Sequence, residues 1–519
     1  MAVTVAPAPA DRRRPPRPPA LLVLAGAAVA LLTLLPLGFV AYEAVQTGWA
    51  EGSRLVFRDR TAELLWTTTR LTAGCVALCL AIGTAAAWLV ERSDLPGRRV
   101  WTVLLVAPLA VPSFVNAFGW VSLAPRLDGY TGALLITTLS YFPLVYLPAT
   151  AALRGLDPGL EETAYALGLG RSAAFARVML PQLRPALLGG ALLVSLHLLA
   201  EFGALALLRY PTFTTAIYDQ YQSSFNSSAA TMLAGVLVLL CLGLLLAELG
   251  LRGRARYARI GGGAPRAVTR ARLGPATLPV LAGLAGLTAL ALGVPLGSLV
   301  RWLVAGSSTG IDTATLLQAT GTSLGFGAVA AGVTVLLAVP AAWLAVRHRG
   351  RLSSVLERST YVSSALPGIV VALALVTIAI RAATPLYQTA PLLIAGYAIL
   401  FLPRAVVTVR AALAQAPPVL DQVARSLGEG TIGTLRRVTL PLIAPGLGAG
   451  AALVFLAVVT ELTATLLLSP LGTRTLATEF WNQSNSLAYG AAAPYAALLV
   501  LLSAPATYLL TRQARRATG

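Results

Sequence analysis

The chain has 519 residues, of which 57% are hydrophobic and only 11% are charged, and its mean hydropathy is +0.76. This composition lies well outside that of soluble globular proteins, so it excludes a soluble enzyme or a soluble binding module. The net charge of +19 comes from arginine, because the sequence contains no lysine. In a membrane protein, surplus arginine is explained by contact with the anionic face of the bilayer, so we expect no nucleic-acid partner and expect membrane lipid instead.

Twelve apolar runs recur along the chain, and each is long enough to cross a bilayer core of about 30 Å as a helix. In the first half they lie near Ala20–Ala41, Leu71–Leu89, Trp101–Leu123, Leu134–Leu153, Ala186–Leu208 and Ala230–Leu246. In the second half they lie near Ala276–Val300, Leu324–Val346, Tyr361–Ile380, Ala390–Val409, Gly446–Leu468 and Ala491–Leu510. The sequence therefore predicts an all-α, polytopic transmembrane protein of about twelve helices.

The distribution of arginine predicts the orientation of these helices. If the N-terminus is cytoplasmic, 29 of the 39 arginines fall in cytoplasmic segments, nine fall outside, and Arg404 lies in a membrane segment. This asymmetry is what the positive-inside rule requires, and the opposite topology would reverse it. We therefore expect both chain ends to be cytoplasmic.

Two polar loops repeat one pattern at an offset of 260 residues. The first contains Glu162, Ala164, Gly168, Leu180 and Pro181, and the second contains Gln422, Ala424, Gly428, Leu440 and Pro441 at the same spacing. The same offset relates Pro143 to Pro403 and Glu201 to Glu461. The pattern indicates two parallel six-helix repeats in one chain, with both loops on the cytoplasmic side.

The repeats and the polar segments between them predict five regions. They are a disordered cytoplasmic tail (1–19), a first repeat (20–250, loop about 154–185), a cytoplasmic linker (251–274), a second repeat (275–511, loop about 411–445) and a C-terminal cytoplasmic tail (512–519).

The local chemistry of each loop predicts a short helix between two turns. Asp157 can cap a helix that begins at Pro158, and Gly168 can close it, because glycine tolerates the left-handed conformation. A second short helix is expected to end at Pro181. The second loop repeats the proline, the glycine and the Leu-Pro pair.

The spacing Glu-x-Ala-x-x-x-Gly, then nine residues, an aliphatic residue, one further residue and Leu-Pro resembles the EAA loop of ABC importer permeases. The resemblance implies the type I permease fold and two copies of a cytoplasmic ABC ATPase, one docked on the first helix of each loop. It assigns ATPase coupling to Glu161, Glu162, Ala164, Gly168, Leu180 and Pro181, and to Asp421, Gln422, Ala424, Gly428, Leu440 and Pro441. Gln422 stands where the family has an acid, which puts a charge-specific contact of the second loop in doubt.

The absence of lysine bears on where ATP is hydrolysed. A phosphate-binding P-loop requires a lysine that contacts the phosphates. We therefore expect this chain to be a translocation subunit rather than an enzyme, with no cofactor or metal of its own, and ATP-Mg to bind a separate ATPase.

Three further segments suggest the cargo. Arg209–Tyr218, Thr460–Leu468 and Gly472–Thr478 look like those of the fused two-repeat permeases of ferric-iron importers. The resemblance implies a bacterial cell-membrane protein fed by a periplasmic or lipid-anchored binding protein. Related subfamilies that carry thiamine, phosphonate, sulfate or polyamines have the same loops, so these cargoes stay open.

Glu201 and Glu461 are the candidate pathway residues, with Tyr218 and Asp219 as further candidates. Each glutamate is predicted to lie inside the fifth helix of its half, about 24 Å beyond the proline at the inner end of the helix. A carboxylate at membrane depth either faces a pathway or is paired, and the available partners for pairing are Arg209, Arg404 and His197.

Two other classes of protein fit the sequence less well. An ion-coupled secondary transporter could use the same two carboxylates as proton sites, but many such transporters have inverted repeats rather than parallel ones. A membrane-embedded enzyme is disfavoured because the sequence has no recognisable nucleophile, metal cluster or cofactor loop.

Overall fold

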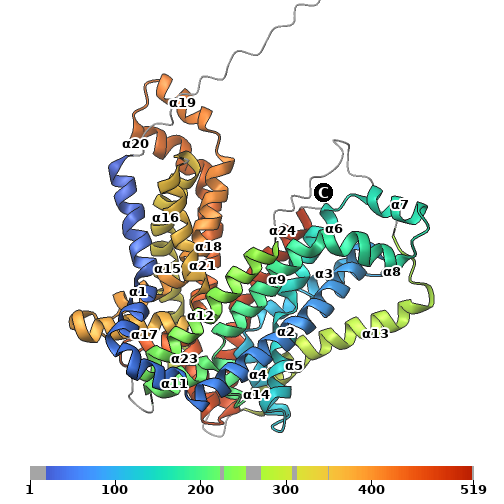
Figure 1. The fold of residues 1–519 in the computed structure, drawn as a ribbon, viewed down its shortest axis with the longest axis horizontal. Coiled ribbons are helices and arrows are strands. Elements are labelled where there is room, and N and C mark those ends of the chain that lie inside the picture. The colour runs from blue at the N-terminus through green and yellow to red at the C-terminus, as the bar shows by residue number, and fades with distance from the viewer. Residues whose placement is uncertain (1–18, 223–226, 253–269, 307–311, 349, 517–519) are drawn as a thin grey trace, which may run out of the picture.

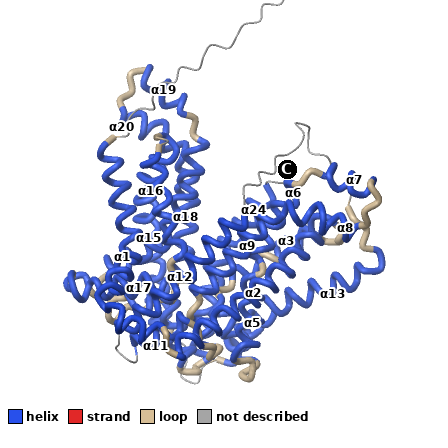
Figure 2. Tube along the Cα trace, in the orientation of Figure 1, coloured by secondary structure: helices blue, strands red, loops and turns tan. Residues whose placement is uncertain are grey.

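The computed structural model describes residues 19–222, 227–252, 270–306, 312–348 and 350–516, and the elements in these ranges are all helical (Figures 1 and 2). The first half contains α1 (Ala20–Val56), α2 (Asp59–Arg92), α3 (Arg98–Leu104), α4 (Ser113–Leu123), α5 (Gly129–Tyr141), α6 (Pro143–Gly155), α7 (Pro158–Ala166), α8 (Arg171–Ala174), α9 (Leu180–Ala200), α10 (Gly203–Leu207), α11 (Phe213–Gln222) and α12 (Ser227–Arg252). The second half contains α13 (Thr277–Thr288), α14 (Val294–Ala305), α15 (Thr313–Arg347), α16 (Arg351–Val362), α17 (Gly368–Ala382), α18 (Ala390–Gln415), α19 (Pro418–Ser426), α20 (Thr431–Thr434), α21 (Leu440–Val459), α22 (Thr463–Leu468), α23 (Leu476–Asn485) and α24 (Tyr489–Arg516). The predicted N-terminal tail, apart from its last residue, and most of the predicted linker lie outside the described residues.

Each of the twelve predicted spans has a helical counterpart, so the predicted fold class is confirmed. Within the described ranges, nine helices are long and apolar enough to cross a membrane without a sharp bend. Two further spans are bent pairs of helices, and the last is the shorter apolar helix Tyr489–Pro505.

The third and ninth spans are not the straight helices that a continuous apolar run suggests. The segments Arg98–Ala110 and Ser113–Leu123 meet at 90°, and Arg351–Ala365 and Gly368–Ala382 meet at 104°. At each bend a residue with extended backbone precedes a proline: Val111 precedes Pro112, and Leu366 precedes Pro367. Proline disfavours the α conformation in the residue before it, so the helix turns at that point although hydropathy is uninterrupted.

The first span of each repeat packs on the opposite half. Helix α1 contacts α15 and α16, and α14 contacts α4. Leu284 and Ala291, from the same span as α14, belong to the buried core of the first half. The two repeats of the sequence are therefore interlocked in space.

The described end of the linker is also attached to the first half. The Ala271 amide donates to the Arg92 carbonyl at 2.8 Å, and the Asp94 amide donates to the Ala271 carbonyl at 3.0 Å. The second repeat thus starts beside the end of α2.

The helices form two arms that meet at one end of the molecule and diverge at the other (Figure 1). One arm contains α15, α16, α18 and α19 together with α1, and the other contains α2, α6 and α7 together with α13. Helices α11, α14 and α23 lie at the joined end, and α7 and α19 lie at the tips of the separated arms. Aromatic rings from both halves pack at the join: Phe480 lies 5.3 Å from Phe114 and 5.4 Å from Phe118, and Trp481 lies 5.2 Å from Phe202, between ring centroids.

Candidate functional site

The two repeated loops have the same local structure. The Asp157 carboxylate accepts a hydrogen bond from the Gly159 amide at 2.9 Å and so caps α7. The helix closes at Gly168, whose φ is +82°, and Gly428 closes α19 with a φ of +91°. The acid cap of α7 and the two glycine turns are those that the sequence predicts, because an acid before proline starts a helix and glycine in the left-handed region ends one. Helix α19 begins after Pro417 and has no side-chain cap.

The exposure of the side chains also repeats from one loop to the other. Ala164 and Ala424 are buried, whereas Glu162 and Gln422 are exposed. Large apolar side chains are exposed on the same surface, among them Leu167 at 78% and Leu427 at 79%. An exposed apolar surface of this kind, formed twice, is typical of a docking site for another protein.

Glu161 and Asp421, one residue earlier than the exposed pair, point into the membrane arms. Glu161 forms an ion pair with Arg92 at 3.4 Å, and Asp421 forms one with Arg347 at 3.2 Å. Arg92 also donates to the Leu153 carbonyl at 2.8 Å.

Arg347 makes the corresponding backbone contact in the second half, donating to the Ala416 carbonyl at 3.1 Å. Each arginine ends the long second span of its half, so it ties that span to the loop helix. We call Arg92 and Arg347 the loop clamps.

The second short helix of each loop differs from the expectation. It does not end at Pro181 or Pro441; it continues through a π-helical turn, Phe175–Met179 or Leu435–Thr439, into the next long helix. A π turn shifts the hydrogen-bond pattern, so the proline that lacks an N–H is accommodated. Leu180 and Leu440, which precede these prolines, are 38% and 44% exposed.

The two glutamates lie in one cavity between the halves. Its volume is about 690 Å³, and its lining includes Glu201 and His197 from the first half and Arg404 and Glu461 from the second. This cavity places charged groups from both repeats around one space.

Both glutamates stand at breaks in their helices rather than inside them. Helix α9 ends at Ala200 and α21 ends at Val459. Each carboxylate then accepts a hydrogen bond at the start of the next short helix, Glu201 from the Ala204 amide at 2.9 Å and Glu461 from the Ala464 amide at 3.0 Å. The predicted unbroken fifth helix is therefore wrong.

The remaining partners of the two carboxylates differ. Glu201 accepts hydrogen bonds from the Ser113 hydroxyl and, at 2.5 Å, from the Tyr141 hydroxyl. Glu461 shares the cavity with the guanidinium of Arg404. Ser113 and Tyr141 were not identified from sequence, because they lie 88 and 60 residues before Glu201 and only the fold brings them together.

Tyr218 and Asp219 lie on α11, beside the cavity rather than in its lining. The Tyr218 ring packs on Phe202, which does line the cavity, with ring centroids 4.5 Å apart. Asp219 is exposed.

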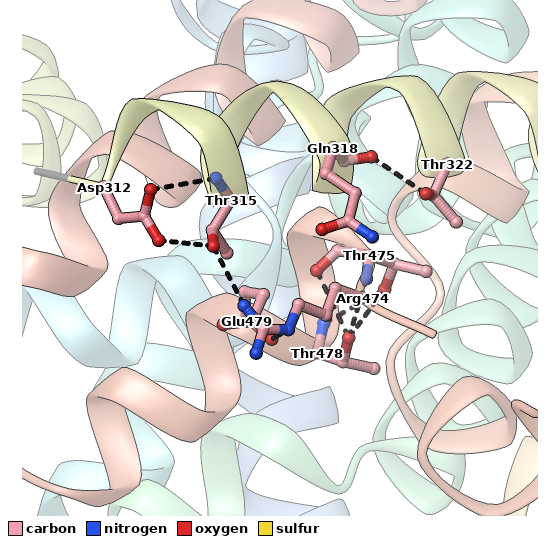
Figure 3. Close-up of polar contacts among 8 residues, drawn as sticks. All are labelled: Asp312, Thr315, Gln318, Thr322, Arg474, Thr475, Thr478 and Glu479. Atoms are coloured by element: carbon pink, nitrogen blue, oxygen red, sulfur yellow. Dashed lines mark hydrogen bonds and ion pairs between the residues drawn. The ribbon is translucent and has the colours of Figure 1, made fainter. Parts of the chain in front are cut away.

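At the end opposite the loops, a polar cluster joins α15 to α23 (Figure 3). Asp312 caps α15 and accepts from the Thr315 hydroxyl at 2.5 Å. Arg474 donates to the Thr315 hydroxyl at 2.9 Å, and Thr475 forms a capping box with Thr478 at the start of α23. The segment from 472 to 478, singled out in the sequence, thus fixes how these two helices meet.

Residues 77–249 and 334–519 match the family described as binding-protein-dependent transport system inner membrane component. The chain belongs to this family. It is therefore a multi-pass inner-membrane permease component with the family domain present twice.

Named relatives cover different fractions of the chain. A Fe(3+)-transport system permease protein of Haemophilus influenzae is 39% identical over 505 residues, spanning 96% of this chain and 99% of the relative. A ferric transport system permease protein of Actinobacillus pleuropneumoniae is 24% identical over 445 residues, spanning 77% of this chain and 64% of the relative. A sulfate transport system permease protein of Escherichia coli is 28% identical over 232 residues, spanning 40% of this chain and 83% of the relative.

Proposed function

We propose that this permease carries ferric iron across the inner membrane through the cavity between its arms. The observation that carries the proposal is the convergence of Glu201 and Glu461, one from each repeat, on a single cavity. Carboxylate oxygens are hard ligands and suit a hard trivalent cation. The ferric-transport relative that matches nearly the full length of the chain supports the same cargo.

The energy would come from two copies of a separate ABC ATPase, which hold ATP-Mg and dock on α7 and α19. The exposed apolar surfaces of the two loops support this, because each offers the same docking side chains. We place the loops and both chain ends in the cytoplasm, on the basis of the arginine distribution. A binding protein outside the cytoplasm would then deliver cargo to the end that carries α11 and α23.

In this orientation the arms diverge towards the cytoplasm (Figure 1). Closure of the ATPase pair would bring α7 and α19 together, and the loop clamps would pass that movement to α2 and α15. The cavity would then open on the opposite side, which is alternating access.

The test is uptake of radiolabelled ferric iron into proteoliposomes that contain the permease, its ATPase and its binding protein. ATP-dependent uptake that survives a protonophore is expected, since the carboxylates are assigned to the cargo rather than to protons. Uptake that requires a proton gradient would instead indicate an ion-coupled transporter.

The carboxylates are tested in the same assay with the double variant Glu201→Gln, Glu461→Gln. Iron uptake is expected to fall at least tenfold while the amount of assembled complex is unchanged. Wild-type uptake by this variant would refute the pathway assignment.

An oxyanion is the second candidate cargo, because Arg404 and His197 line the same cavity and a sulfate permease is among the relatives. Radiolabelled sulfate and molybdate, each supplied with the cognate binding protein, separate this candidate from iron.

A further inference from the structure

The repeat offset of 260 residues allows the surroundings of the two carboxylates to be compared position by position. Tyr141, which donates to Glu201, corresponds to Phe401, which has no hydroxyl. Leu144 corresponds to Arg404, and both of these side chains line the cavity. The surroundings of the two carboxylates therefore differ: Glu201 has a hydroxyl donor, whereas Glu461 has a guanidinium in the same cavity.

The bent spans show the same divergence. Ser113 follows the proline of the bend in the first half and donates to Glu201. In the second half Gly368 follows the corresponding proline, and its backbone lies so close to Glu461 that a Cβ there would be 3.1 Å from the carboxylate oxygen. No hydroxyl can be supplied from that position.

The consequences for the two charges differ. Two hydroxyls and one amide, all neutral donors, hold the Glu201 carboxylate by hydrogen bonds. Glu461 accepts a hydrogen bond from the Ala464 amide and shares the cavity with the Arg404 guanidinium. A charge at membrane depth is stable only when it is paired or hydrated, so the guanidinium is the group that balances Glu461.

Arg404 is exposed and lines the cavity together with Glu461. Its guanidinium carbon lies over the Phe401 ring, 5.2 Å from the ring centroid. Arginine remains positively charged under all physiological conditions, so its charge is always available to this carboxylate.

We propose that Arg404 is the counter-ion of Glu461 and makes this carboxylate selective for a cationic cargo. The guanidinium balances the carboxylate while the cavity is empty, and the cargo displaces it on arrival. Glu201, fixed by Ser113 and Tyr141, needs no such exchange. The inference rests on the proposed function, because it assumes that the cavity is the pathway.

Displacement has a kinetic consequence. A cargo cation that must compete with a tethered guanidinium is held less tightly, and is released more readily, than one that meets a free carboxylate. Arg404→Leu, which gives the second half the residue that the first half has at position 144, is therefore expected to lower both the KM for the iron-loaded binding protein and the turnover number. The turnover number should fall about tenfold, which is within the range of coupling between side chains that act in one network.

The decisive experiment is a pair of double-variant cycles on iron uptake in proteoliposomes with the ATPase and binding protein present. Arg404→Leu is measured alone, with Glu461→Gln, and with Glu201→Gln. If Arg404 acts through Glu461, its effect on turnover should nearly disappear in the Glu461→Gln background and persist in the Glu201→Gln background. Equal effects in both backgrounds would overturn the proposal.

Two further variants distinguish a loss of the counter-ion from a loss of folding. Phe401→Tyr together with Arg404→Leu supplies a hydroxyl of the kind that Tyr141 gives to Glu201, and should recover part of the turnover lost in Arg404→Leu alone. Arg404→Lys, which keeps a positive charge, should retain most of the wild-type turnover. No recovery by either variant would count against a counter-ion role.

The outcomes also separate this inference from the proposed function. If neither Glu201→Gln nor Glu461→Gln alters uptake, the pathway assignment has failed and the inference fails with it. If Glu461→Gln impairs uptake but the cycle with Arg404→Leu is additive, only the inference has failed. If Arg404→Leu abolishes sulfate uptake by the same complex, Arg404 is a ligand for an anionic cargo and the counter-ion role is wrong.

Discussion

Arg92 and Arg347 each contact two parts of the same loop, the acid of the loop helix and a carbonyl at the end of the preceding span. Arg92 is almost fully buried, with 3% of its side chain exposed, and Glu161 is 15% exposed. A partly buried ion pair of this kind is costly to break from one side, since the remaining charge loses its partner. The loop clamps are thus the contacts that hold each loop helix to a membrane span.

Arg92→Gln should therefore loosen α7 without unfolding the membrane arms. We expect a loss of stability of roughly 1–3 kcal/mol, as for a buried polar group left without a partner, and a lower ratio of iron transported to ATP hydrolysed. Uptake and ATP hydrolysis are measured together in proteoliposomes. Arg99→Gln is the matched control, because it removes the same charge from an exposed site seven positions away in the sequence; an equal effect of both changes would rule out a specific clamp.

Asp312 provides a pH-dependent contact at the other end of the molecule (Figure 3). Hydrogen bonds from the Thr315 side chain and amide hold the pKa of the Asp312 carboxyl below its ordinary value. A group whose pKa is lower in the folded state stabilises the fold above the pKa of the unfolded chain, and this contribution is lost as pH falls through the folded value.

The thermal stability of the wild type should therefore approach that of Asp312→Ala as the pH is lowered from about 6 to about 3. Asp312→Asn, which keeps a neutral capping group, should differ from Asp312→Ala by an amount that does not change over this range. Melting curves of the purified protein in detergent give both comparisons. A gap between wild type and Asp312→Ala that stays constant with pH would show that the charge makes no contribution.

At the scale of elements, the two loops were predictable because their signals are local. Prolines at the start of each loop helix and a glycine after two or three turns act within a few residues, and the structure has both where they were expected. The acid cap is present in the first loop, at Asp157. The clamps were not predictable, because Arg92 and Glu161 are brought together only by the fold. The break at Glu201 was missed for a related reason: the apolar run continues across it, and hydropathy does not report backbone direction.

The glycine turns give a test of the loops as elements. An L-residue in the left-handed region is strained by about 1 kcal/mol or more, so Gly168→Ala should fray the end of α7 and weaken ATPase binding roughly fivefold. A Cβ would meet nothing within 4 Å at either Gly168 or Gly170, but only Gly168 has a positive φ, so Gly170→Ala is the control. The affinity of the purified ATPase for each variant in detergent is the measurement, and wild-type affinity for Gly168→Ala would remove the turn from the docking site.

On the scale of the whole molecule, the exchange of first spans makes the two halves interdependent. Helix α1 lies against the second half at Gly26, where a Cβ would be 2.9 Å from Leu344 and 3.4 Å from Leu356. Such close contact leaves no room for a large side chain.

Gly26→Leu should therefore overpack this contact and lower stability by roughly 1–3 kcal/mol. Gly38→Leu changes the same helix at a site where a Cβ would meet nothing within 4 Å, and should leave the melting temperature close to that of the wild type. Melting temperatures of the two variants decide the point: if they match, α1 is not held by the second half.

The same exchange has a consequence for how the protein is made. Helix α1 leaves the ribosome long before its partners α15 and α16, which begin at Thr313 and Arg351. At the usual rate of synthesis the delay is on the order of 10–50 s. During that time lipid must cover the face of α1 that later packs on the second half, so insertion of this chain is completed only when the newly made second repeat displaces that lipid.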